Sequence, residues 1–273
     1  MTPLLEIRNL RTYYPIQRGI LARTVGAVRA VDGVDLTVQA GETVGIVGES
    51  GCGKTTLART ILLLEKPHTG EIRIDGVDIA SLRGSALKAY RRKVQVVFQD
   101  PFASLNPRHT VLDLVTEGML AHGLATATNR RDLAARLLDD VGLSADLLDR
   151  YPHAFSGGQR QRIAIARALS LGPRLLICDE AVSALDLSVR AQILNLLVDL
   201  RERHGLAYLF ITHDMGVVQH LAHRIVVMRH GVVVEAGATE AVLAHPAHPY
   251  TRELLAAIPR IQERTGKDGC TDI

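Results

Sequence analysis

The chain has no tryptophan, aromatic residues make up only 4% of it, and it contains three cysteines, Cys52, Cys178 and Cys270. No two cysteines form a C-x-x-C pair, so we expect reduced thiols and neither a disulfide framework nor a cysteine metal site. No apolar run approaches the roughly 18 residues that span a bilayer, and the first residues lack the pattern of a secretory leader. We therefore expect the chain to stay in the cytoplasm unless a partner holds it at a membrane.

The chain also lacks a strong excess of positive or negative charge. The 32 lysines and arginines stand against 29 aspartates and glutamates, a net charge of +3, and the basic residues are spread along the chain. Proteins that bind nucleic acid concentrate basic residues on one surface, so we expect no nucleic-acid partner. With 273 residues, 47% of them hydrophobic, the chain can bury the core of one large or two modest domains.

The segment with the clearest chemistry is rich in glycine and fits the pattern G-x-x-x-x-G-K-[ST]. A short β-branched stretch, Thr43 to Val47, precedes it, and a helix-forming stretch, Leu57 to Leu64, follows it. Glycines let successive N–H groups turn toward one anion, and the helix start adds the positive end of its dipole. The alternative is an ordinary glycine-rich turn, which the Lys-Thr pair and both flanks argue against. The predicted phosphate cradle consists of Gly48, Glu49, Ser50, Gly51, Cys52, Gly53, Lys54, Thr55 and Thr56.

Within this cradle two side chains have specific tasks. Lys54 would reach the β- and γ-phosphates of a nucleotide, and the Thr55 hydroxyl would ligate Mg²⁺. ATP and Mg²⁺ are therefore the expected ligands.

A second helix start resembles an anion site. Apolar residues recur at helical spacing from about Thr110 to Arg150, where strand patterns are missing, so we predict an all-helical insertion. It ends at Ser156, Gly157, Gly158 and Gln159, just before a predicted helix from Arg160 to Leu169. A hydroxyl and exposed amides at a positive helix end form a second place for a phosphate.

Acidic residues follow a buried strand that we predict from Arg174 to Cys178. Asp179 and Glu180 are adjacent there, so their side chains should point to opposite sides and do different work. Asp179 can hold Mg²⁺, and Glu180 can polarise an attacking water. A pair of surface acids is the alternative, but acids at the mouth of a buried strand are costly without a cation.

Polar residues also end two other predicted strands, Val94 to Phe98 and Ala207 to Ile211. Gln99 follows the first, and His213 follows the second. Ligands of α/β sheets bind at the carboxyl ends of strands, so both side chains are candidates to reach one ligand. Each can equally be an ordinary surface residue, because a glutamine or a lone histidine at a loop start is common.

The order of these segments predicts the fold class: α/β, a P-loop NTPase core with a mainly parallel sheet, an N-terminal antiparallel β subdomain and an inserted helical subdomain. Strands at Leu5 to Leu10 and at Val34 to Val38, and a hairpin at Glu71 to Ile79, would form the antiparallel part. Tyr13 and Tyr14 lie between the first two strands, where an aromatic ring could stack on adenine or simply be a strand residue.

With these segments identified, the chain resembles the nucleotide-binding subunit of an ATP-binding cassette (ABC) transporter over nearly its whole length. Six motifs occur in the order of that family. They are GESGCGKTT (48–56), Gln99, FSGGQRQR (155–162), LLICDE (175–180), SALD (183–186) and His213, which match the Walker A, Q-loop, signature, Walker B, D-loop and H-loop.

The resemblance assigns expected roles within one chain. Tyr14 would be the aromatic residue that faces adenine, with Tyr13 as the alternative. Gln99 would contact Mg²⁺ or the water and sense the membrane partner, Glu180 would be the catalytic base, and His213 would hold the γ-phosphate.

The family resemblance also implies a second subunit. Residues Ser156 to Gln159, with Asp186 of the D-loop, would face the nucleotide bound to the opposite subunit, so that ATP joins a head-to-tail dimer.

Two segments narrow the resemblance. HPAHPYTRELLAAIP (245–259) and DEAVSALDLSVRAQILNLL (179–197) are similar to importers of dipeptides, oligopeptides and nickel. Such an ATPase implies two membrane permeases, a second ATPase subunit and an external binding protein, and a peripheral position at the cytoplasmic face of the membrane. The expected division is an ABC ATPase domain over 1–240, with the helical subdomain at about 100–160, and a C-terminal extension over 241–273.

Two other functions remain as alternatives to a peptide or nickel importer. They are an export or lipoprotein-release cassette and an ABC ATPase of DNA repair or translation.

Overall fold

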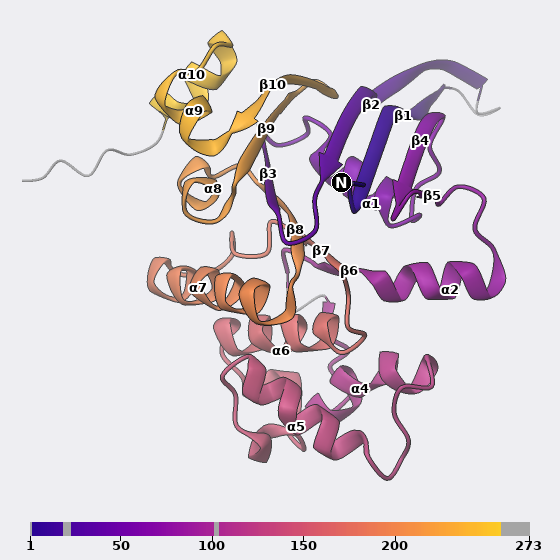
Figure 1. Cartoon of the computed structure of the whole chain (residues 1–273), viewed down its shortest axis with the longest axis vertical. Helices are drawn as coiled ribbons and strands as arrows, with labels where there is room; N and C mark the ends of the chain where they lie inside the picture. The colour runs from indigo at the N-terminus through magenta and orange to yellow at the C-terminus, as the bar shows by residue number, and fades with distance from the viewer. Residues whose placement is uncertain (1, 19–22, 101–103, 258–273) are drawn as a thin grey trace, which may run out of the picture.

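The computed structural model describes residues 2–18, 23–100 and 104–257, and its strands form two sheets (Figure 1). The four-stranded sheet has the order β2-β1-β4-β5, and the six-stranded sheet has the order β10-β9-β3-β8-β7-β6. The first sheet comprises β1 (Leu5–Arg18), β2 (Arg23–Val38), β4 (Thr69–Ile74) and β5 (Val77–Asp78). The second comprises β3 (Thr43–Val47), β6 (Val94–Val97), β7 (Leu175–Asp179), β8 (Ala207–Thr212), β9 (Arg224–Arg229) and β10 (Val232–Ala238).

The six-stranded sheet is parallel except for β10, which pairs antiparallel with β9. Every residue of β3, β7 and β8 is buried, as expected for the continuous apolar runs of a sheet that is covered on both faces. Along β8 the side chains alternate: Tyr208 and Phe210 join a core with the helices from α4 (Val111–Ala121) to α7 (Leu187–His204), while Leu209 joins a core with the four-stranded sheet. The predicted mainly parallel sheet is confirmed.

The N-terminal sheet is antiparallel, as predicted, but its first hairpin is longer. The expectation that Tyr13 and Tyr14 lie between the first two strands is wrong, because β1 continues through them and pairs with β2 as far as Arg18. The pairing of β1 with β4 ends at Arg11. Pro15 therefore lies in a part of β1 that is paired with β2 alone. An unpaired edge tolerates a residue without an N–H.

Most of the helices lie beside the six-stranded sheet, and the predicted helical stretch contains α4 and α5 (Figure 1). The sequence patterns did not predict α2 or α8. The helices are α1 (Lys54–Ile61), α2 (Gly84–Lys93), α4 (Val111–Ala121), α5 (Arg130–Asp140), α6 (Gly157–Leu169), α7 (Leu187–His204), α8 (Met215–Leu221), α9 (Thr239–Ala244) and α10 (Pro249–Ala256), with 3-10 turns η1 (Ala145–Leu147) and η2 (Pro152–Ala154). Among the described residues, no helix combines the length and the apolar character needed to cross a membrane.

A stability prediction follows from the contact between α8 and β3. A Cβ on Gly45 of β3 would lie 2.3 Å from Cγ1 of the buried Val218, so Gly45→Ala should lower the free energy of unfolding by about 1 to 3 kcal/mol. The matched control is Gly118→Ala in α4, where the nearest atom would lie 3.4 Å away and alanine should raise helix stability by about 0.5 to 1 kcal/mol. Urea unfolding of both variants measures the changes, and equal effects would contradict the packing argument.

Candidate nucleotide site

The glycine-rich segment forms a loop between β3 and α1, as its flanks predicted. A Cβ on Gly48 would lie 2.2 Å from the carbonyl oxygen of Met228 in β9, and a Cβ on Gly53 would lie 2.0 Å from the carbonyl oxygen of Ala30 in β2. Gly53 also has a φ of 110°, which other residues rarely adopt. Close contact with two neighbouring strands therefore requires glycine at both positions.

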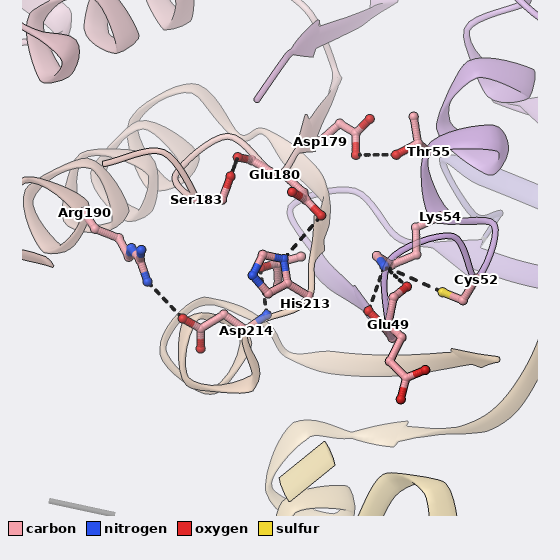
Figure 2. A network of polar contacts seen from close by, with 12 residues as sticks. Glu49, Cys52, Lys54, Thr55, Asp179, Glu180, Ser183, Arg190, His213 and Asp214 are labelled. Atoms are coloured by element: carbon pink, nitrogen blue, oxygen red, sulfur yellow. Dashed lines mark hydrogen bonds and ion pairs between the residues drawn. The ribbon is translucent and has the colours of Figure 1, made fainter. Parts of the chain in front are cut away.

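Lys54 is the first residue of α1, and its ammonium group lies inside the loop (Figure 2). Its Nζ donates hydrogen bonds to the carbonyl oxygens of Gly48 at 2.7 Å and of Glu49 at 2.8 Å, and lies 3.6 Å from Sγ of Cys52. Lys54 is 4% exposed. An ammonium group has three N–H donors, and the third makes only the long bond to Cys52 Sγ, a weak acceptor that an anion held by the loop can replace. This arrangement fits a phosphate.

Thr55 and Asp179 join the loop to the end of β7. The Thr55 hydroxyl donates to a carboxylate oxygen of Asp179 at 3.2 Å (Figure 2). Burial raises the pKa of Asp179 above its usual value. A carboxylate is costly to bury unless a cation accompanies it, and carboxylate and hydroxyl oxygens are the ligands that Mg²⁺ takes in proteins. The donor set at this position therefore fits a magnesium ion.

Glu180 and His213 come from the ends of neighbouring strands, β7 and β8. The backbone N–H of Glu180 donates to the carbonyl oxygen of Ile211 at 2.9 Å, and Nδ1 of His213 lies 3.3 Å from a carboxylate oxygen of Glu180 (Figure 2). Glu180 has a φ of 50°, a conformation that costs energy for residues other than glycine and that occurs often at functional sites. This turn directs the carboxylate of Glu180 toward the loop, while Asp179 faces Thr55.

A cleft of about 300 Å³ lies over the loop and contains Glu180 in its wall. Part of its lining comes from β2 and from the turn between β9 and β10, which the sequence motifs did not include. The added residues are Val28, Arg29, Ala30, His230 and Gly231. The turn is tied to the loop because the N–H of Gly231 donates to the carbonyl oxygen of Cys52 at 2.8 Å. A glycine in a β-turn has no distinctive sequence signal, so these residues could be found only from the fold.

Tyr14 and Tyr13 lie on β1 next to this cleft. Tyr14 pairs with Val28, a cleft residue, and is half-buried. The hydroxyl of Tyr13 instead donates to Asp32 at 2.6 Å, and its ring stacks on His68 with 5.1 Å between the ring centroids. Tyr13 also pairs with a cleft residue, Arg29, whose guanidinium carbon lies 5.9 Å from the Tyr13 ring centroid. These contacts occupy both the hydroxyl and the ring of Tyr13, which favours Tyr14 as the aromatic residue beside a bound base.

Several of the predicted site residues do not line this cleft. Gln99 is exposed just after β6, and Asp186 is exposed at the start of α7. Residues Ser156 to Gln159 begin α6, which lies with α4 and α5 in the lower part of Figure 1, far from α1. There Ser156 and Gln159 cap the helix: the Ser156 hydroxyl accepts from the Gln159 N–H at 3.3 Å, and the Gln159 side chain accepts from the Ser156 N–H at 3.1 Å.

The strand β3, the glycine loop, the helix α1 and the acid that ends β7 define a P-loop nucleotide-binding protein. Residues 31–183 match the family model of the ABC transporter, and residues 234–270 match the oligopeptide/dipeptide transporter C-terminal region. The chain therefore belongs to the ABC transporter family and is an ATPase of that family.

Individual relatives agree with this membership. The probable peptide ABC transporter ATP-binding protein y4tS of Sinorhizobium fredii is 52% identical over 94% of this chain and 72% of that protein. The oligopeptide transport ATP-binding protein AppF of Bacillus subtilis is 48% identical over 96% of this chain and 80% of that protein. Among solved structures, the dimeric post-hydrolysis state of the ATP-binding cassette MJ0796, bound to ADP and Pi, matches with a TM-score of 0.75 and 31% identity over 86% of this chain and 98% of that chain. The predicted family and fold class are confirmed.

The raised pKa of Asp179 predicts a gain in stability when its charge is removed. Between the pKa of the unfolded chain, about 3.9, and the raised pKa of the folded protein, the folded state binds more protons, so stability falls as the pH rises through this range. Asp179→Asn should therefore raise the Tm at pH 7 by a few degrees without Mg²⁺ and nucleotide, and by less at pH 4. Thermal unfolding in EDTA measures both values.

The matched control for this prediction is Asp199→Asn, which changes an exposed acid of α7 and should leave the Tm nearly unchanged. An unchanged or lower Tm of Asp179→Asn at pH 7 would show that the buried carboxylate does not cost stability.

Proposed function

We propose that the chain is the ATP-hydrolysing subunit of an importer that carries dipeptides or oligopeptides into the cell. The observation that supports this cargo class is the match of residues 234–270 to the oligopeptide/dipeptide transporter C-terminal region. Relatives about half identical to this chain are named for peptide and oligopeptide transport. We therefore propose peptides as the cargo in preference to nickel, and import in preference to export or work on nucleic acid.

In the proposed site, residues 48–56 bind the phosphates of ATP. Lys54 keeps its bonds to two loop carbonyls and exchanges the weak bond to Cys52 Sγ for one to the β- and γ-phosphates. Thr55, Asp179 and Gln99 would hold Mg²⁺, which supplies positive charge against the phosphate oxygens. Tyr14 would stack on the adenine beside Val28.

Glu180 is the proposed general base. Its carboxylate takes a proton from a water whose oxygen attacks the γ-phosphorus, while the bond to the β,γ-bridging oxygen breaks and ADP leaves. Nδ1 of His213 lies 3.3 Å from a carboxylate oxygen of Glu180. The other ring nitrogen, Nε2, is therefore the one available to a γ-phosphate oxygen.

The proposed active unit is a head-to-tail dimer of ATPase subunits. Residues Ser156 to Gln159 are at the start of α6, away from the loop of their own chain, which is the separation that a site shared between two chains requires (Figure 1). The Ser156 hydroxyl accepts from Gln159 and keeps its own proton for a γ-phosphate of the opposite subunit. Asp186 would lie at the same interface. Loss of the γ-phosphate removes the shared ligand, so the dimer opens.

Two permease subunits and an external binding protein complete the proposed importer. The subunit would be held at the cytoplasmic face of the membrane through these permeases. Its proposed division is an ABC ATPase domain over 1–240, with the helical subdomain at about 100–160, and a C-terminal extension over 241–273. Purification of the complex from membranes, followed by uptake of labelled peptides into vesicles that contain the binding protein, tests the cargo. Uptake of nickel and not of peptides would overturn the peptide assignment.

Replacement of Glu180 by glutamine tests the catalytic base. Glu180→Gln keeps the size of the side chain but removes its basic carboxylate, so Mg-ATP binding should persist while turnover falls at least about 100-fold. ATP should then hold the two subunits together as a dimer that size-exclusion chromatography detects. Near-normal hydrolysis by this variant would remove Glu180 as the base.

The matched change in the loop is Lys54→Ala. It removes the ammonium group that faces the phosphates, so it should lose nucleotide affinity itself, in contrast to Glu180→Gln. Calorimetric titration with Mg-ATP separates the two variants. Wild-type affinity in Lys54→Ala would count against the phosphate cradle.

A further inference from the structure

The C-terminal helix α10 places one tyrosine against the glycine loop. Tyr250 is 1% exposed, and its hydroxyl oxygen accepts a hydrogen bond of 2.9 Å from the backbone N–H of Glu49. The two residues are 201 positions apart in the chain. Helices α9 and α10 lie beside the β10 end of the six-stranded sheet, shown in yellow in Figure 1. A segment outside the six nucleotide motifs thus contacts the loop directly.

The contacted N–H belongs to the peptide that joins Gly48 to Glu49. The carbonyl oxygen of the same peptide accepts from Nζ of Lys54 at 2.7 Å. In a planar trans peptide the N–H and the C=O point in opposite directions. Tyr250 and Lys54 therefore hold one peptide from its two sides, and the orientation of the N–H toward Tyr250 also fixes the carbonyl that positions Lys54.

The ring of Tyr250 is held where this contact requires it. It belongs to a small core with Val47, the last residue of β3, and Val227 of β9. The guanidinium carbon of Arg229 lies 4.7 Å from the ring centroid, a cation–π contact that covers the ring. Because β3 leads directly into the loop, the ring and the loop share one rigid support.

The backbone around Tyr250 is fixed from β10. The carboxylate of Glu235 accepts hydrogen bonds from the N–H of Ala247 at 2.8 Å and from the N–H of His248 at 3.0 Å. Nδ1 of His248 in turn accepts from the N–H of Tyr250 at 3.1 Å and caps α10, with Pro249 at its first position. A polar network thus fixes the start of the helix that presents the tyrosine.

We propose that Tyr250 is a positioning residue of the nucleotide site, whose hydroxyl fixes the 48–49 peptide and through it Lys54. The inference rests on the proposed role of residues 48–56 in binding nucleotide. It makes the C-terminal segment a structural part of that site. A tyrosine that only filled the core would act through its ring, so the hydroxyl oxygen is the atom that distinguishes the two roles.

Tyr250→Phe in the full-length chain removes this oxygen and keeps the ring. The Glu49 N–H then loses its acceptor and the orientation of the 48–49 peptide is held less firmly, so the Kd for Mg-ATP and the KM for ATP should rise together, about threefold to tenfold. Calorimetric titration with Mg-ATP and steady-state hydrolysis measure the two constants, and thermal unfolding measures the Tm.

The matched control is Tyr208→Phe, because Tyr208 is also buried and its hydroxyl donates to the carbonyl oxygen of Leu197 at 2.8 Å, away from the loop. It should lower the Tm similarly and leave the Kd within about twofold of wild type. Equal weakening of Mg-ATP binding by both variants would trace the effect to general stability and overturn the inference.

Lys54→Ala separates the inference from the proposed function. If Lys54→Ala loses Mg-ATP binding and Tyr250→Phe binds as tightly as wild type, the positioning role is overturned and the proposed function stands. If Lys54→Ala binds Mg-ATP normally, the proposed nucleotide role of the loop is itself overturned.

Discussion

The structure of the nucleotide site depends on two glycines that pack so closely against neighbouring backbone that no side chain would fit. A Cβ on Gly48 or Gly53 would overlap a backbone carbonyl oxygen of β9 or β2. Because backbone atoms cannot move aside as a side chain can, these contacts fix the course of the loop between two strands from different sheets. The N–H of Gly231 adds a hydrogen bond to the loop from the turn after β9. The N-terminal sheet and the six-stranded sheet thereby meet at the loop, and the cleft, the lysine and the two acids take their positions from that junction.

The two buried charges at this junction are stabilised to different degrees. The ammonium group of Lys54 is bound by two carbonyl oxygens, so it is held in place before any phosphate arrives. The carboxylate of Asp179 accepts from the Thr55 hydroxyl, but burial still raises its pKa. The folded protein is therefore less stable for having this carboxylate, and a cation beside it would offset that cost. Ligand binding and stability are coupled here through one side chain.

Local patterns predicted the parts of the fold that local physics determines. The buried runs of β3, β7 and β8 identify strands by composition, and the Gly-Lys-Thr pattern between a strand and a helix identifies the loop. Helix α2 was missed because Tyr90 is its one buried residue, so it has no apolar stripe, and α8 is only seven residues long. The role of Tyr250 could not be predicted, because its contact joins residues 201 positions apart and follows from the way α10 packs on the sheet.

The two helix starts that the proposed dimer brings to one nucleotide differ in a way that fits their different tasks. Helix α1 begins after Gly53 and has no side-chain cap, so its first N–H groups are available to an anion and an anion stabilises the helix. Helix α6 is capped by Ser156 and Gln159 within its own chain, so it is complete without a ligand and offers the Ser156 hydroxyl as an additional donor. Nucleotide should therefore bind first to the loop before α1. The capped start of α6 in the opposite subunit can then bind this nucleotide and later release it without any loss of helix structure. A dimer that closes on ATP and opens after hydrolysis requires such reversible binding.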